Sequence, residues 1–86
     1  MLLSEVYDRY TQLVEEEDRF ILKLEVCELA EHALFDMVYK SEQEPDSTTV
    51  KEILIAVHTI DLRLQAELLE LRLEKMNLSR KIKLLT

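Results

Sequence analysis

The spacing of apolar residues constrains this chain more than any other feature of its sequence. In two stretches, roughly residues 4–40 and 49–85, apolar side chains recur in alternating steps of three and four. Such spacing puts them on one face of an α-helix, and a seven-residue repeat is typical of helices that pack together as a coiled coil. The sequence therefore predicts two long helices, each with one continuous apolar seam.

The two seams can be written out residue by residue. In the first helix the seam is apolar except at two glutamates; it comprises Leu3, Val6, Tyr10, Leu13, Glu17, Phe20, Leu24, Cys27, Glu31, Leu34 and Val38. In the second it is interrupted by one lysine; it comprises Val50, Ile53, Val57, Ile60, Leu64, Leu68, Leu71, Lys75, Leu78, Ile82 and Leu85. The steps Ile60 to Leu64 to Leu68 are both of four, which predicts a stutter in the repeat.

A polar segment centred on the single proline separates the two stretches. Residues 41–47 are polar apart from Pro45, which disfavours helix at the residue before it. Thr49 followed by Glu52 has the spelling of a capping box, and Ser4 is a weaker N-cap signal. We predict one domain over residues 1–86, an all-α antiparallel two-helix hairpin: helix 4–40, turn 41–48 and helix 49–85.

Composition excludes several kinds of functional site. The chain has no glycine, and P-loops, dinucleotide-binding loops and nucleophile elbows all need one. The longest apolar run, residues 53–57, is far shorter than the roughly 20 residues of a membrane span. A single cysteine, Cys27, cannot form an internal disulfide and is expected to be a small buried hydrophobe. These features predict a cytoplasmic protein with no membrane partner.

Charge is divided unevenly between the two halves of the sequence. The whole chain has a net charge of −7, but residues 1–46 carry −9 and residues 47–86 carry +2. This imbalance favours pairing between the helices and disfavours nucleic acid as a partner. With a turn near Pro45, antiparallel neighbours have numbers that sum to about 89. The predicted pairs are Glu17 with Arg72, Glu31 with His58, and Glu5 and Asp8 with Lys81 and Lys83.

The second helix also carries a second apolar row, about opposite its seam. Its members are Ile55, Thr59, Leu62, Ala66, Leu69, Leu73, Met76 and Arg80. A shorter row on the first helix comprises Leu22, Val26, Leu29, Ala33 and Met37. The hairpin can cover only one row per helix. We therefore predict association, with an interface centred on Leu62, Leu69, Leu73 and Met76 and extended by Ile55, Ala66, Leu22, Val26, Leu29 and Ala33.

These patterns favour a non-enzymatic protein-protein interaction module, such as a small coiled-coil adaptor, chaperone or regulator, with no cofactor. Two kinds of partner fit the exposed row. One is a second copy, which would give a homodimeric four-helix bundle. The other is an amphipathic helix of a different protein.

Two alternatives from other classes remain. The first is a small helical enzyme that holds a divalent metal with Glu28, Glu31 and His32, although Glu28 and His32 fall outside the seam and no metal site is predicted. The second is a helical-hairpin dimer that binds RNA through the basic residues Lys75, Arg80, Lys81 and Lys83. The acidic residues 15–18 are interpreted as a solvated belt.

Overall fold

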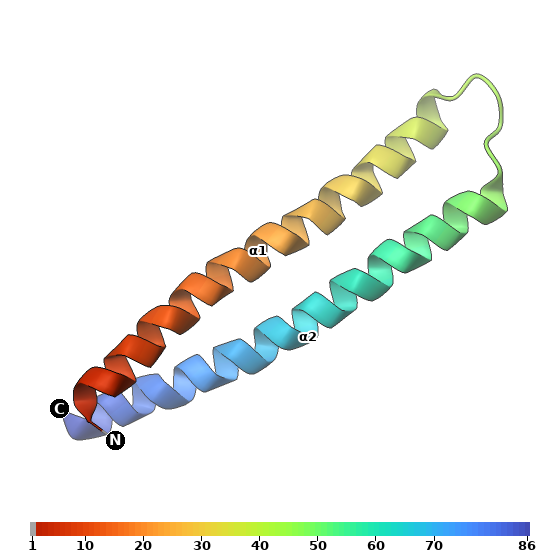
Figure 1. Cartoon of the computed structure of the whole chain (residues 1–86). Coiled ribbons are helices and arrows are strands. Elements are labelled where there is room, and N and C mark those ends of the chain that lie inside the picture. Colours follow the sequence, from red (N-terminus) through yellow and green to blue (C-terminus); the bar gives the residue numbers. More distant parts are fainter. Residues whose placement is uncertain (1) are drawn as a thin grey trace.

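The computed structural model describes residues 2–86, which form two antiparallel helices joined by a short loop (Figure 1). Helix α1 spans Leu3–Lys40 and helix α2 spans Ser47–Leu85. The molecule is a rod of 64 × 17 × 14 Å, with both termini at one end and the loop at the other. The predicted all-helical hairpin is therefore confirmed.

Helix α2 begins two residues earlier than the capping-box spelling predicts. Asp46, directly after Pro45, is the N-cap, and its carboxylate accepts hydrogen bonds from the Thr48 amide (3.1 Å) and the Thr49 hydroxyl (2.9 Å). Thr49 is thus a donor within the first turn of the helix rather than its cap. A carboxylate satisfies the free amides of a helix start more strongly than a hydroxyl, because it also interacts favourably with the helix dipole.

The other helix ends are also defined by local hydrogen bonds and backbone conformation. Leu2, not Ser4, is the N-cap of α1, and its amide donates to the Glu5 side chain at 3.3 Å. At Ser41 the backbone becomes extended and α1 ends. The last turn of α2 is closed by the Thr86 amide, which donates to the Ile82 carbonyl at 3.1 Å.

The best-packed core lies near the termini. Four buried side chains form one cluster, and three partly buried ones pack against it. The buried ones are Val6, Leu13, Leu71 and Leu78, and the partly buried ones are Tyr10, Phe20 and Ile82. All seven belong to the two predicted seams, so the apolar spacing alone located this core.

The seam of α2 differs from the predicted one toward the loop. Ile53 and Ile60 are each 44% exposed, whereas Leu54 and Asp61 are partly buried. The residues that face α1 are Val50, Leu54, Val57, Asp61, Leu64, Leu68, Leu71, Lys75, Leu78 and Ile82. Their steps alternate between four and three throughout, so the predicted stutter is absent. An unbroken seven-residue repeat keeps one face of α2 on α1, and the helix keeps this phase even though it brings a carboxylate into the seam.

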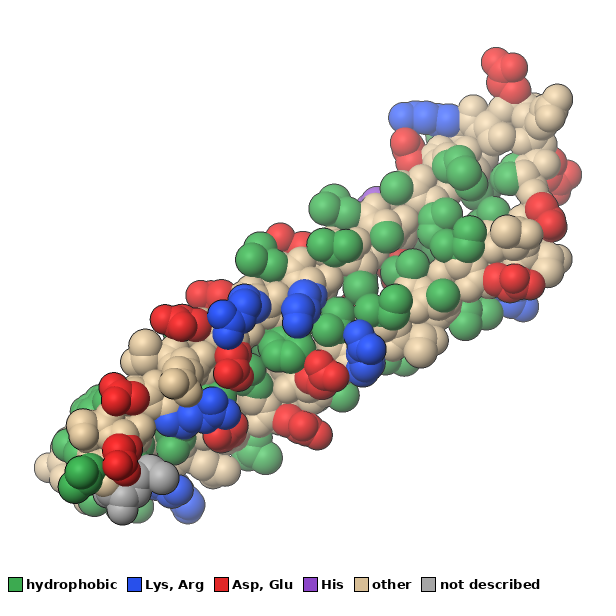
Figure 2. Space-filling model, viewed as in Figure 1, with side chains coloured by type: hydrophobic (Ala, Val, Ile, Leu, Met, Phe, Trp, Pro, Cys, Tyr) green, Lys and Arg blue, Asp and Glu red, His purple; other side chains and the backbone are tan. Residues whose placement is uncertain are grey.

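The two helices run side by side as far as the loop (Figure 1), but fewer of their side chains are buried toward it. We call residues 2–20 and 71–86 the terminal half, and residues 21–70 the turn half. No side chain from residue 28 to residue 63 is fully buried. Figure 2 shows hydrophobic side chains gathered over the turn half of the visible face, with charged side chains of both signs nearer the middle and the termini.

Candidate interaction surfaces

A cluster of ion pairs closes the seam of the terminal half. The Glu17 carboxylate accepts hydrogen bonds from Arg72 Nε and Lys75 Nζ, both at 3.0 Å, and its side chain is only 16% exposed. These two cations, Lys75 more than Arg72, hold the pKa of Glu17 below its ordinary value. The predicted Glu17–Arg72 pair forms, and Lys75, which interrupts the apolar seam, finds its partner in the same carboxylate.

A second ion pair joins Arg9, about two turns before Glu17 on α1, to Glu74, which lies between Arg72 and Lys75 on α2. Arg9 donates to both carboxylate oxygens of Glu74, at 3.0 and 3.1 Å, and also lies 3.6 Å from Glu16. The hydrogen bond to Glu74 raises the pKa of the Arg9 guanidinium. Because this pair is exposed, it fixes the alignment of the helices more than it stabilises them.

The pairs predicted nearer the loop and at the termini do not form. Across the described residues 2–86, no hydrogen bond or ion pair joins Glu31 to His58, which is exposed on α2. Because the seam of α2 runs through Asp61, Glu31 shares a groove with a second carboxylate instead of pairing with an imidazole. Nor does any ion pair within residues 2–86 join Glu5 or Asp8 to Lys81 or Lys83. Over the described residues, Arg80, Lys81 and Lys83 at the end of α2 therefore have no ion-pair partner.

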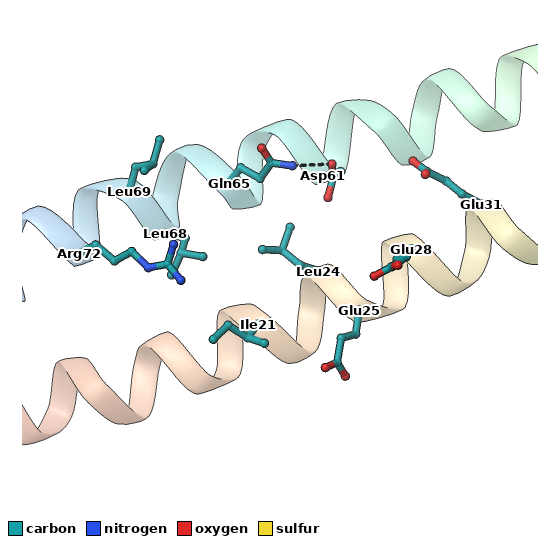
Figure 3. A pocket seen from close by; sticks show the side chains of 10 residues that line it. All are labelled: Ile21, Leu24, Glu25, Glu28, Glu31, Asp61, Gln65, Leu68, Leu69 and Arg72. Carbon is teal, nitrogen blue, oxygen red and sulfur yellow. Dashed lines mark hydrogen bonds between the residues drawn. The ribbon is translucent and has the colours of Figure 1, made fainter.

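An acidic groove opens on one side of the turn half, with a volume of about 690 Å³ (Figure 3). Its carboxylates come from both helices: Glu25, Glu28 and Glu31 of α1 and Asp61 of α2. Its apolar lining is Ile21, Leu24, Leu68 and Leu69. Arg72 also lines it but is bound to Glu17. In the described part of the chain none of the four carboxylates has a lysine or arginine partner, so the groove is strongly negative.

A second groove, of about 470 Å³, opens on the other side of the seam. Its lining is mostly apolar and comprises Val26, Cys27, Ala30, Val57, Ile60 and Leu64. Lys23, Arg63 and Glu67 complete it, so its formal charge is +1. The Cys27 thiol is buried in the seam at this point, as its apolar surroundings in the sequence predict.

The second apolar row of α2 forms an exposed outer face. We use that name for Ile55, Thr59, Leu62, Ala66, Leu69, Leu73 and Met76, all exposed in the single chain. Leu69 and Met76 are 65% and 68% exposed, and Figure 3 shows Leu69 pointing away from α1. The one hydroxyl in the row, that of Thr59, donates to the Ile55 carbonyl at 2.8 Å. Every polar side-chain group of the outer face thus has a hydrogen-bond partner within its own helix, and burying the face would leave none of them unsatisfied.

The apolar row of α1 is exposed too, but it opens in a different direction. Leu22, Val26, Leu29 and Ala33 are all exposed. Val26 borders the second groove, whereas Leu69 of α2 borders the acidic one. One partner helix lying along α2 would not reach both rows. The extension of the interface onto α1 therefore stays a prediction, and the apolar row of α1 would need a second partner to cover it.

Of the alternative metal site at Glu28, Glu31 and His32, the structure brings together only the exposed pair of Glu28 and His32. His32 Nε2 lies 3.8 Å from Glu28 Oε1, and both side chains are more than two-thirds exposed. Over residues 2–86, no group of three histidine, cysteine, aspartate or glutamate side chains is arranged to hold a metal ion. Neither α1 nor α2, as far as the chain is described, contains a stretch apolar and long enough to cross a membrane.

Comparison with known proteins adds no family: no protein-family model, no curated protein and no solved structure matches this chain. The surfaces must therefore be interpreted from their own chemistry. Two of their features escaped the sequence reasoning: Asp61 in the seam and Lys75 as a partner of Glu17. An unbroken seven-residue repeat, continued backward from Leu64 to Val50, would have found Asp61.

Proposed function

We propose that this protein is a protein-protein interaction module that buries the outer face of α2 against a helix of another chain. That chain is either a second copy or a different protein with an amphipathic helix. The module acts as a small coiled-coil adaptor, chaperone or regulator, and its chemistry is association rather than catalysis.

One observation carries the proposal: the hairpin exposes too much surface for a chain of its size. Its accessible area is 6838 Å², whereas a compact monomer of this mass exposes about 5,300 Å². The excess of about 1,500 Å² is nearly twice the roughly 800 Å² that each partner buries in a standard protein-protein interface. Much of it is apolar, and burying a leucine-sized side chain contributes roughly 1.5 to 3 kcal/mol.

The charge distribution supports the same function. Helix α2 presents a row of large apolar side chains flanked by charged residues, which is the arrangement found at helix-helix interfaces of bundles. The row is long and nearly straight, so a second helix can lie along it over several turns. A groove for a small molecule would instead concentrate its polar groups in an enclosed pocket.

Leu69→Glu tests the proposal, because it places a charge in the middle of the outer face. We expect the variant to remain helical and to raise the dissociation constant of the assembly at least tenfold, a loss of about 1.4 kcal/mol. Leu29→Glu is the matched control, since Leu29 is equally exposed, at 67%, but lies on the other side of the hairpin. Light scattering with size-exclusion chromatography gives the mass, and circular dichroism gives the helicity.

The outcomes separate clearly. Dissociation by Leu69→Glu and not by Leu29→Glu supports docking on α2. Dissociation by both would assign the apolar row of α1 to the interface as well. A pure chain that is a stable helical monomer, captures no helical partner and is indifferent to Leu69→Glu contradicts the proposal.

A further inference from the structure

We infer that the outer face of α2 is occupied by a second copy of this chain, antiparallel to the first, with Leu73 at the two-fold axis. In this arrangement Arg80 and Lys83 of each copy lie against the acidic groove of the other. The inference rests on the proposed function and adds to it the occupant, the orientation and the register.

The first argument is that the row of the outer face continues into two cations. Steps of four and three lead from Leu73 through Met76 to Arg80 and Lys83. Both cations are exposed, and neither has an ion-pair partner within residues 2–86. The outer face is therefore apolar in its middle and basic at its C-terminal end.

The second argument is that the matching negative charge lies too far away in the same chain. The groove with Glu28 and Asp61 is level with residues 61–65 of α2, about 17 residues from Arg80 and Lys83. At 1.5 Å per residue this is a separation of roughly 25 Å, which no side chain spans. Arg80 and Lys83 can therefore meet the carboxylates of such a groove only between two molecules.

The third argument is the symmetry of the row itself. About a two-fold axis at Leu73, antiparallel neighbours have numbers that sum to 145 or 146. The axis places Leu73 beside Leu73, Leu69 beside Met76, Ala66 beside Arg80 and Leu62 beside Lys83. Each outer-face position from residue 62 to residue 83 thus meets another member of the same row. Apolar residues fill the centre, and the small Ala66 leaves room for the aliphatic stem of an arginine.

A parallel arrangement of the two copies is disfavoured by electrostatic repulsion. A parallel copy would set the basic ends side by side and the two acidic grooves side by side, so like charges would meet at both ends. The antiparallel copy pairs opposite charges at both ends. Each cation-carboxylate pair at such an exposed rim contributes little by itself, but the four sites select one orientation over the other.

Cross-linking at the axis tests the register. In a Cys27→Ala background, we expect Leu73→Cys to form a covalent dimer on oxidation, because the two thiols would face each other. Ile55→Cys, also on the outer face, should not, since its two copies would be about 54 Å apart. Non-reducing electrophoresis measures both. Cross-linking of both variants would show a parallel dimer and overturn the inference, while leaving the proposed function intact.

Mixing two charge-reversed variants tests the pairing of basic end and acidic groove. Arg80→Glu with Lys83→Glu, and separately Glu28→Lys, should each weaken the homodimer, the double change by about tenfold in dissociation constant. An equimolar mixture should form the heterodimer in preference to either homodimer, because only the mixed pair restores opposite charges at both ends.

The control for the mixing experiment is a double variant that reverses two charges at positions outside the outer face. Arg63→Glu with Lys81→Glu should show no preference for the Glu28→Lys chain. Equal preference for both double variants, or none for either, would overturn the assignment of the basic end to the groove. A wild-type chain that stays monomeric would overturn this inference together with the second-copy form of the proposed function, whereas a dimer with the wrong register overturns the inference alone.

Discussion

The terminal half and the turn half of the hairpin have the same apolar spacing but pack differently. In the terminal half, Val6, Leu13, Leu71 and Leu78 are buried and Glu17 lies between two cations. In the turn half, Cys27, Leu64 and Leu68 are buried next to the terminal half, but no residue from 28 to 63 is fully buried. The seam spacing alone therefore does not decide how tightly a helix pair closes.

The polar residues in the seam account for the difference. Glu17 meets Lys75 and Arg72 of α2, so desolvating its carboxylate is offset by two charge-assisted hydrogen bonds. Glu31 and Asp61 line the same groove and carry the same charge. Bringing two such carboxylates together in a dry seam is unfavourable, so this region stays open to water. Four predictions follow from this comparison, ordered by the size of the expected effect.

The largest effect is expected from core truncation in the terminal half. Leu13 is fully buried, so Leu13→Ala should lower the free energy of unfolding by about 2 to 5 kcal/mol. Leu34→Ala, the same change at a partly buried seam position of the turn half, should cost less than half as much. Urea denaturation followed by circular dichroism, at one chain concentration, measures both. Equal losses would mean that the two halves are packed alike.

A smaller loss is expected from the ion-pair cluster. Glu17→Gln removes the charge that Lys75 and Arg72 share, and should lower the free energy of unfolding by about 1 kcal/mol. Glu31→Gln is the matched control in the other half, and it should be neutral or stabilising because it relieves repulsion from Asp61. The same denaturation experiment applies. A destabilising Glu31→Gln would show that Glu31 has a favourable partner.

Replacing Glu31, a seam carboxylate of the turn half, by an apolar residue should make the two helices pack more tightly there. We expect Glu31→Leu to raise the free energy of unfolding by roughly 0.5 to 1 kcal/mol, because it adds apolar surface to the seam and removes one of two like charges. Hydrogen exchange should show slower amide exchange between residues 28 and 63. Glu28→Leu, an exposed change next to the seam, should leave both quantities nearly unchanged, and a comparable gain there would point to a nonspecific effect of leucine.

The pH dependence gives the smallest effect and follows from the pKa of Glu17. That pKa is lowered in the folded chain from an ordinary value of 4.5. The ion pairs therefore contribute stability above pH 4.5, and the contribution is lost as the pH falls through the lowered pKa. The stability difference between wild type and Glu17→Gln should thus be constant near neutral pH and shrink in acid. A difference that grows on acidification would contradict the direction of the shift.

Much of the hairpin could be predicted from the sequence, because it depends on the spacing of residues along each helix. The seven-residue repeat predicted both helices, the positions of the buried cluster and the Glu17–Arg72 pair. Helix starts were harder. Asp46 and Thr49 are both acceptable caps for α2, and α1 is capped by Leu2, a residue type that gives no capping signal, in place of Ser4. The seam of α2 near the loop was harder still, since Ile53 and Leu54, or Ile60 and Asp61, are neighbours and either member of each pair can face α1.

The amino-acid sequence by itself determined that the chain forms two long helices, that they fold back on each other and that apolar surface is left over. These properties follow from spacing along one helix and need no knowledge of the partner. Only the tertiary structure decided the phase of α2, and with it the placement of Asp61 near Glu31 and the opening of the acidic groove. The phase is set by packing of the whole helix against α1, so a well-packed terminal half brings two carboxylates into one groove of the turn half, which no local pattern reveals.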